Sequence, residues 1–269
     1  MKFVLKLLKL SPKWTLAFKV LPFVAVIIIL KFVIHYFEAE FLSLSSLFTA
    51  VVSANIFLIG FLISGVLVDY KESEKIPGDM AACIETMADE CAILHKSKNS
   101  PAAHKCLAHL LDFNNSLIDW FYKKERTATI LDKISAFNEY FIDFEPQTQA
   151  NFIVRLKQEQ NLIRKMVYRV HTIRETSFLG SGYAIVELIT AVLVIGLVFI
   201  QIDPYYESIF FVAFVSFILI YMIYFIKDLD NPFGYHFEDN YVEDVSLKPL
   251  LDLRHRVKKM LVDANEKGR

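Results

Sequence analysis

The stretch from Leu47 to Val68, LFTAVVSANIFLIGFLISGVLV, decides the fold. It contains no charged residue, and it is long enough to cross the roughly 30 Å hydrocarbon core of a bilayer as a helix of about 20 residues. A strand edge or loop facing lipid would leave backbone N–H and C=O groups unpaired. The stretch is therefore predicted to be a transmembrane helix, and it is unusual in being rich in small and polar residues.

Three further apolar windows have a similar length. Leu21–Phe37 carries the single charge of Lys31, Tyr183–Ile202 has Glu187 near its start, and Ile209–Ile226 is uncharged. Hydrophobic residues make up 55% of the 269 positions, while the net charge is only −1. This distribution excludes a soluble protein with a single core and a disordered chain, and it argues against a nucleic-acid binder.

The distribution of Lys and Arg predicts the orientation of the four spans. Residues 1–20 hold five lysines, residues 69–182 hold 15 Lys and Arg, and the tail from Lys227 holds eight, whereas the loops 38–46 and 203–208 hold none. We expect a multi-pass protein of the cell membrane with both termini cytoplasmic. The first span has no A-x-A cleavage site and is followed closely by another span, so we interpret it as a retained helix.

The segment between the second and third spans is predicted to be helical. Ile76, Met80, Ile84, Met87, Cys91 and Leu94 fall at spacings of three and four. Further helices are predicted after Pro101, before Pro146, over Phe152–Ile173 and over Leu247–Val262. The expected fold is an all-α integral membrane protein with four transmembrane helices and a helical cytoplasmic domain inserted between spans two and three. The expected parts are a cytoplasmic amphipathic segment 1–20, the first two spans in 21–68, the cytoplasmic domain 69–182, the last two spans in 183–227, and a cytoplasmic tail 228–269.

Enzyme chemistry is not predicted. Phosphate-binding loops, nucleophile elbows and zinc-protease helices are absent from the sequence. Three cysteines give no disulfide framework. Cys91 and His95 lie one helical turn apart, but the spacings around them match no standard zinc pattern. We therefore expect no metal site and no cofactor.

The second span has a distinctive face. Ser53, Phe57, Gly60 and Ser64 share one broad side of the helix, and Phe61 follows Phe57 after four residues. One interpretation is tight packing against another helix, with Gly60 and Ser64 as a small-xxx-small pair. The other interpretation is a pore-lining surface.

A family resemblance favours the pore. In the segment Ile56–Ala82, the pattern Phe57, Gly60, Phe61 is followed by a charged stretch and by Ile76-Pro77. After the fourth span comes Asn231-Pro232-Phe233-Gly234. In order and spacing these motifs resemble the bestrophin family, as does the four-span plan with its long helical insertion.

The resemblance implies a pentameric anion channel with the second spans around the axis. It implies a narrow neck of apolar rings, to which Phe57 and Phe61 correspond, whereas Ser53 departs from the family pattern. Animal members hold calcium in a dense acidic run after the N-P-F-G motif. Here only Glu238 and Asp239 follow closely, which favours a calcium-independent channel.

Several basic residues remain to be interpreted. Lys31 should either snorkel outward beside His35 or supply positive charge to an anion pathway. A second group is expected to contact anionic headgroups or to line an anion-concentrating vestibule, unless it serves topology alone. This group consists of Arg164, Lys165, Arg169 and Arg174.

The leading hypothesis is an oligomeric channel for anions such as chloride, with inorganic anions, membrane lipids and further copies of the chain as partners and no nucleic acid. The alternative is a non-conducting scaffold or signalling subunit whose cytoplasmic domain binds a partner. Cation selectivity also stays open, because the predicted outer loops carry Glu38, Glu40, Asp203 and Glu207.

Overall fold

The computed structural model describes residues 14–176, 180–233 and 245–267, and it separates the chain into two compact units. Unit 1 combines Met1–Tyr70 with Ser177–Asn231. Unit 2 combines Lys71–Thr176 with Pro232–Arg269. Along the sequence, the chain therefore passes from unit 1 to unit 2, back to unit 1, and again to unit 2.

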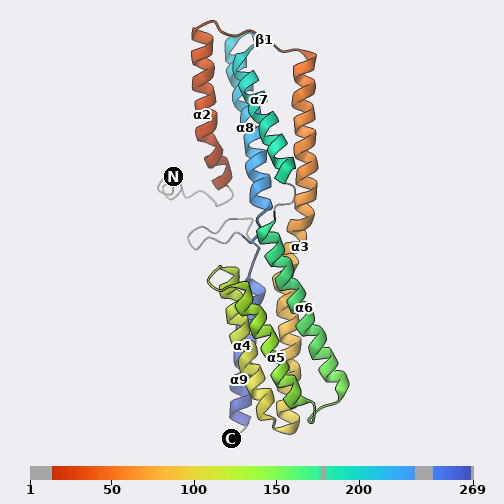
Figure 1. Cartoon of the computed structure of the whole chain (residues 1–269). Coiled ribbons are helices and arrows are strands. Elements are labelled where there is room, and N and C mark those ends of the chain that lie inside the picture. Colours follow the sequence, from red (N-terminus) through yellow and green to blue (C-terminus); the bar gives the residue numbers. More distant parts are fainter. Residues whose placement is uncertain (1–13, 177–179, 234–244, 268–269) are drawn as a thin grey trace. The chain divides into compact units, whose positions relative to one another are not determined.

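Helices account for nearly all of the described structure, as Figure 1 shows, and this confirms the prediction of an all-α protein. The helices are α2 (Thr15–Tyr36), α3 (Ser46–Lys98), α4 (Pro101–Phe121), α5 (Thr127–Phe144), α6 (Ala150–Glu175), α7 (Gly180–Phe199), α8 (Tyr205–Leu229) and α9 (Lys248–Lys267). Two short strands, β1 (Leu42–Ser43) and β2 (Ile200–Gln201), form a parallel bridge that the sequence did not predict.

The helix α3 is longer than the sequence analysis suggested. The apolar span from Leu47 and the amphipathic stripe from Ile76 belong to one helix of 53 residues. Pro77 lies inside this helix and does not end it, although a proline there removes one backbone hydrogen bond.

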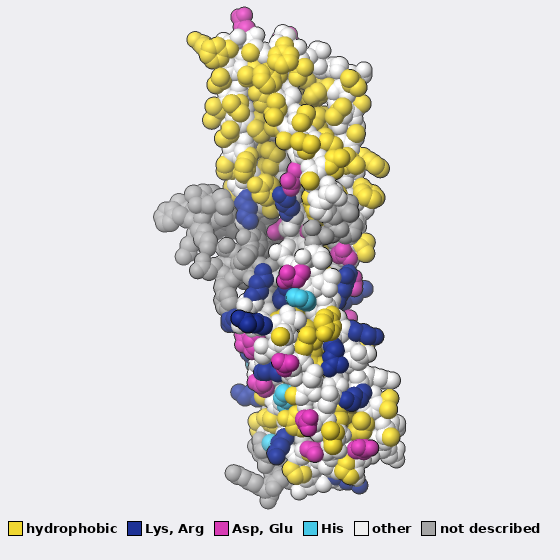
Figure 2. Space-filling model, viewed as in Figure 1, with side chains coloured by type: hydrophobic (Ala, Val, Ile, Leu, Met, Phe, Trp, Pro, Cys, Tyr) yellow, Lys and Arg dark blue, Asp and Glu magenta, His cyan; other side chains and the backbone are white. Residues whose placement is uncertain are grey.

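Unit 1 contains the membrane-spanning part of the chain. Four helical stretches, in α2, α3, Ala150–Phe199 and α8, are long and apolar enough to cross a bilayer. Their outward side chains are largely hydrophobic, as the yellow surface around these helices in Figure 2 illustrates. Helices α3, α7 and α8 share a buried cluster that includes Ile59, Val186 and Leu219. α7 approaches α3 closely where Gly196 faces Phe48, since a Cβ at Gly196 would lie 3.1 Å from that ring.

The start of α2 extends the first apolar window. The helix begins at Thr15, so residues 15–20 of the predicted N-terminal segment continue directly into the first span. Residues 1–13 of that segment lie outside the described residues.

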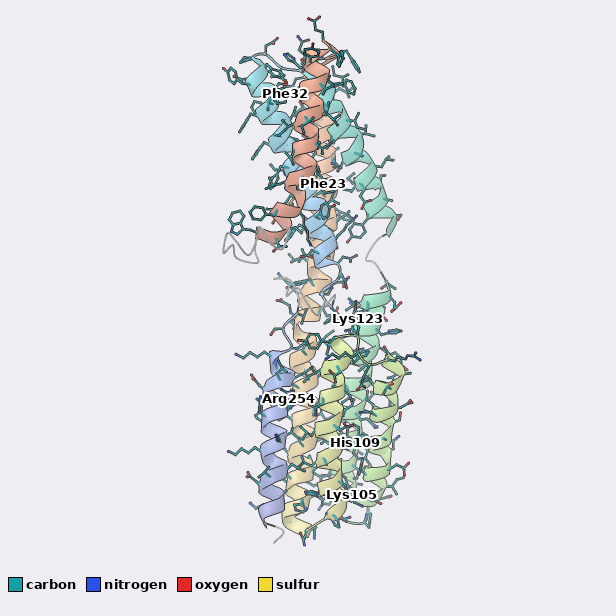
Figure 3. All side chains as sticks on the ribbon, turned by 90° about the vertical axis from the view of Figure 1, so that its left-hand side faces the viewer. Phe23, Phe32, Lys105, His109, Lys123 and Arg254 are labelled. Atoms are coloured by element: carbon teal, nitrogen blue, oxygen red, sulfur yellow. The ribbon has the colours of Figure 1, made fainter. Side chains whose placement is uncertain are left out.

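Unit 2 is a helical bundle with an apolar core. It consists of the later part of α3 with α4, α5, α6 and α9, and its core holds Met80, Leu110, Phe137 and Val167 among others. Ser100 caps α4 by accepting a hydrogen bond from the backbone N–H of Ala103. Polar and charged side chains such as Lys105 on α4 and Arg254 on α9 cover the surface, as Figure 3 shows.

Candidate functional site

One face of α3 in unit 1 has no packing partner among the described residues. Phe57 is 73% exposed and Phe61 is 62% exposed. Ser53, Gly60 and Ser64 are also exposed. The five residues predicted to share a face therefore do so, and all five point away from the rest of their own chain.

The opposite face of α3 packs inside unit 1. Ile59, Leu62 and Val66 are almost completely buried. Asn55 is 1% exposed, and its amide donates a hydrogen bond of 2.9 Å to the hydroxyl of Thr190 on α7. In hydrocarbon, such a bond gives a buried amide a partner that lipid cannot provide, and it fixes the rotation of α3.

The polar groups on the exposed face are satisfied within α3 itself. The hydroxyl of Ser53 donates to the carbonyl of Thr49 at 2.9 Å, and that of Ser64 donates to the carbonyl of Phe61 at 2.9 Å. A Cβ placed on Gly60 would meet no described atom within 4 Å. Gly60 and Ser64 therefore do not mediate helix packing within one chain, and any close approach at this face must come from another molecule.

The exposed face of α8 differs from that of α3. It presents Phe210, Phe211, Phe214 and Ile218, which suits contact with lipid chains. On α3, hydroxyl and glycine positions alternate with the two phenylalanines. A helix that only faced lipid would have no need of these polar positions.

Lys31 is buried in the interior of unit 1, which neither of its two interpretations anticipated. Its side chain has 0% exposure, and its Nζ lies 2.6 Å from Oε1 of Glu40. The same ammonium donates to the carbonyls of Val198, at 3.3 Å, and of Ile200. A cation there suits the unpaired carbonyls at the C-terminal end of α7. The residue therefore joins three segments of the fold and is not placed to contact a passing anion.

Glu40, in the loop between α2 and α3, is held by two groups. Partial burial raises its pKa, but hydrogen bonds from Lys31 and His35 outweigh this and hold the pKa below its usual range. His35 Nδ1 lies 3.2 Å from Glu40 Oε2, and the imidazole stacks on the ring of Tyr205 at 3.6 Å. The carboxylate is therefore ionised and already partnered.

The four basic residues predicted to meet anions or lipids lie in three different settings. Lys165 and Arg169 line a pocket beside α3 in unit 2. Arg164 lies next to Ser135, 3.5 Å from its hydroxyl. Arg174 donates to the carbonyls of Trp120 and Phe121, at 3.3 and 2.9 Å, so its guanidinium caps the end of α4.

Phe233, of the motif after the fourth span, packs into the core of unit 2. Phe233 is completely buried, 5.6 Å from the ring of Phe121, and its ring also lies 5.9 Å from the Arg174 guanidinium. Pro232 accepts a backbone hydrogen bond from Val245. Asn231 is exposed, and Gly234 lies outside the described residues, as do Glu238 and Asp239. Ile76 and Pro77 are buried within α3.

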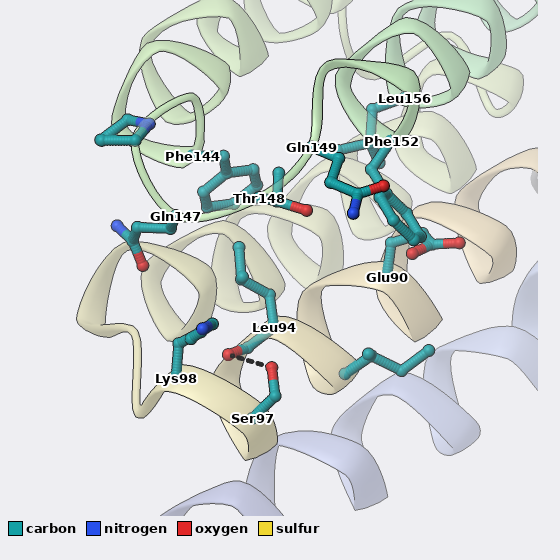
Figure 4. Close-up of a pocket in the computed structure, with 12 residues that line it drawn as sticks. Glu90, Leu94, Ser97, Lys98, Phe144, Gln147, Thr148, Gln149, Phe152 and Leu156 are labelled. Carbon is teal, nitrogen blue, oxygen red and sulfur yellow. Dashed lines mark hydrogen bonds between the residues drawn. The ribbon is translucent and has the colours of Figure 1, made fainter.

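Unit 2 also contains a pocket of about 440 Å³ between the end of α3, the loop after α5 and the start of α6. Its wall mixes apolar side chains such as Leu94 and Phe152 with the amides of Gln147 and Gln149, as seen in Figure 4. Glu90 at its edge is paired with Arg155 at 2.9 Å. The hydroxyl of Ser97 in its wall donates a hydrogen bond of 3.4 Å to the carbonyl of Leu94.

The cysteines of unit 2 are buried free thiols. Burial raises the pKa of Cys83 to about 12, and contact with Cys91 followed by burial raises the pKa of Cys106. Across the described part of the chain, no group of three or more His, Cys, Asp and Glu residues is arranged to hold a metal ion.

Comparison with known proteins identifies the fold. No family model and no curated protein matches the sequence. A single-substitution variant of a bacterial bestrophin homologue from Klebsiella pneumoniae superposes with a TM-score of 0.74 at 13% identity, covering 91% of this chain and 99% of the other. A second variant gives 0.73 at 15% identity, with 93% and 98% covered. The chain therefore has the fold of the bacterial bestrophin homologues, which confirms the resemblance at the level of the fold.

Two features of the site were missed from the sequence. Asn55 could have been noticed as the single side-chain amide in the apolar stretch from Leu47 to Val68. The approach of Lys75 on α3 to the same pocket as Lys165 on α6 has no sequence signal, because the two residues are brought together only by tertiary packing.

Proposed function

We propose that the chain is one subunit of a homo-oligomeric channel of bestrophin type, which conducts anions such as chloride through a pore lined by the exposed face of α3. The observation that carries this proposal is the unpartnered face of Ser53, Phe57, Gly60, Phe61 and Ser64 on a helix whose other face is packed. One chain supplies one such helix, so several copies must surround a common axis. The family resemblance gives five as their number.

The chemistry of this face suits a gate. Rings of Phe57 and Phe61 around an axis would form a constriction where an ion must shed water without compensating dipoles, at a cost of several kcal/mol. The positive edges of phenyl rings can still face a passing anion. Gly60 allows neighbouring helices to approach closely, and Ser53 leaves one end of the constriction wider and wetter than a third ring would.

Pairing neutralises one of the four acidic residues at the predicted outer end, while Glu38 and Asp203 stay exposed and keep that end acidic. Glu40 would attract cations if its charge were free, but it is paired with Lys31 and bound by His35. In the proposed orientation both termini and unit 2 are cytoplasmic, following the Lys and Arg distribution. Lys165 is exposed, and a basic side chain that reaches the membrane surface attracts anionic lipids at about 1 kcal/mol.

The test is a double substitution with a matched control. Phe57→Ala/Phe61→Ala removes both rings from the exposed face of α3. Phe210→Ala/Phe214→Ala removes two exposed rings at the same spacing from α8, where they stack 5.9 Å apart. In planar bilayers of purified protein, we expect the α3 variant to conduct more than wild type, and the α8 variant to match wild type. Equal conductance of all three proteins would refute the pore assignment.

A second candidate function rests on the 440 Å³ pocket of unit 2, which could receive a segment of a partner protein. In that case the chain would be a non-conducting scaffold or signalling subunit. Wild type and the α3 variant would then both fail to conduct, although single-particle images would show intact particles.

A further inference from the structure

The pocket at the end of α3 combines an apolar floor with a polar wall. Its volume of about 440 Å³ lies within the roughly 300–1,000 Å³ that is usual for sites of small organic ligands. The floor consists of the buried side chains of Leu94, Phe144 and Leu156, whereas Ile93 and Phe152 are exposed at the rim. All of these residues belong to unit 2, so the pocket lies within a single unit.

The charges of the lining do not cancel. Glu90 and Lys98 are the charged side chains among the described residues of the lining. Glu90 pairs with Arg155 at 2.9 Å and is thereby neutralised. The ion pairs found among the described residues do not include Lys98. The acidic residues next to the wall, Asp143 and Glu145, are exposed and do not line the pocket, which therefore presents one positive charge beside its apolar floor.

The uncharged polar side chains of the wall can donate further hydrogen bonds. Figure 4 shows Ser97 and Lys98 of α3 on one side of the pocket and Thr148, in the loop between α5 and α6, on the other. Gln149 precedes α6 and makes no capping hydrogen bond with its side chain, which leaves that amide to meet a ligand. Gln147, in contrast, already donates to a backbone carbonyl of α5 at 2.8 Å. Hydroxyl and amide donors beside an ammonium group suit a ligand that carries a hydrogen-bond acceptor.

We infer that this pocket binds a small organic carboxylate with a short alkyl chain, held by Lys98 at its charged end and by the apolar floor along its chain. The positive charge disfavours an organic cation, and an inorganic anion would gain nothing from the apolar floor. Because Lys98 is exposed, its ion pair contributes modestly, and burial of the chain supplies most of the affinity, roughly fourfold for each methylene removed from water. The inference goes beyond the proposed function, because it concerns unit 2 alone and does not depend on conduction.

The first experiment measures the binding of hexanoate to the purified full-length protein by saturation-transfer NMR, with protein-free micelles as the background. We expect Lys98→Gln to weaken binding roughly two- to fivefold, as for the loss of an exposed ion pair, and Lys98→Arg to retain it. Hexanol, which has the chain without the charge, should bind wild type more weakly than hexanoate by a similar factor. Lys105→Gln makes the same change at an exposed lysine of α4, labelled in Figure 3, and should match wild type. Ser97→Trp fills the pocket from an exposed position of the wall and should abolish binding.

The second experiment locates the ligand. Crystals soaked in 6-bromohexanoate should show an anomalous bromine peak over the apolar floor in wild type and none there in Ser97→Trp. Equal affinities of wild type for hexanoate and hexanol, or of wild type and Lys98→Gln for hexanoate, would overturn the carboxylate as the ligand. Hexanoate binding that is the same in Ser97→Trp and wild type, or a bromine peak only outside the pocket, would overturn the site. Neither experiment measures conduction, so failure of this inference leaves the proposed channel intact, and a protein that does not conduct leaves this inference to be decided by binding.

Discussion

The buried ion pair of Lys31 and Glu40 should be the most sensitive electrostatic contact of unit 1. In Lys31→Met the side chain keeps its length but loses its charge. Glu40, only 10% exposed, would then keep its charge without its closest partner, and the carbonyls of Val198 and Ile200 would lose a donor. Breaking a buried pair from one side costs roughly 3–5 kcal/mol, because the remaining charge is left uncompensated.

This cost is large enough to measure by thermal unfolding in detergent. At about 2–4 °C per kcal/mol for chains of 150–250 residues, the midpoint should fall by roughly 6–20 °C. Lys105→Met makes the same chemical change at an exposed lysine of α4 and should leave the midpoint nearly unchanged. Lys31→Met/Glu40→Gln removes both charges and should be more stable than Lys31→Met alone.

The direction in which pH changes the contribution of Glu40 to stability follows from its pKa. The pKa of Glu40 is lowered in the folded protein, so its contribution to stability is fully present above the ordinary value of 4.5. That contribution is lost as the pH falls through the lower folded pKa. The difference in midpoint between wild type and Glu40→Gln should therefore be constant near neutral pH and should shrink only in acid. Equal midpoints for Lys31→Met and wild type, or for the single and double variants, would refute the reasoning.

Three further predictions concern topology, the end of α4 and the thiols. A cysteine at Leu44 should react with an impermeant maleimide added outside intact cells, and a cysteine at Lys105 should not; the opposite result would invert the proposed orientation. Arg174→Lys should lower the stability of unit 2 by about 1–3 kcal/mol in denaturant titrations, because a lysine cannot reproduce the paired hydrogen bonds to the end of α4, and an unchanged midpoint would contradict this role. Cys83, with its pKa raised to about 12, should resist iodoacetamide at pH 8 in folded protein and react after unfolding, so rapid native labelling would disprove its burial.

The sequence predicted those features that depend on local composition. Apolar runs located the spans, and spacings of three and four located the helices of unit 2. The Phe57, Gly60 and Phe61 pattern led to the correct fold, and its residues do share an exposed face.

Features made by distant segments could not be predicted. The partners of Lys31 on the far side of unit 1 are 167 and 169 residues away in the chain, so an isolated lysine in an apolar span looked like one that snorkels. The same limit applies to the bridge between Leu42 and Ile200. The continuity of α3 was missed because charged residues between Val68 and Ile76 separate the apolar span from the amphipathic stripe.

Pro77 gives α3 a defined point of weakness. The helix continues from Ser46 to Lys98 with this proline inside it, and a proline in a helix interior removes one backbone hydrogen bond. Any bending of α3 should therefore concentrate at Pro77, where the backbone lacks one donor.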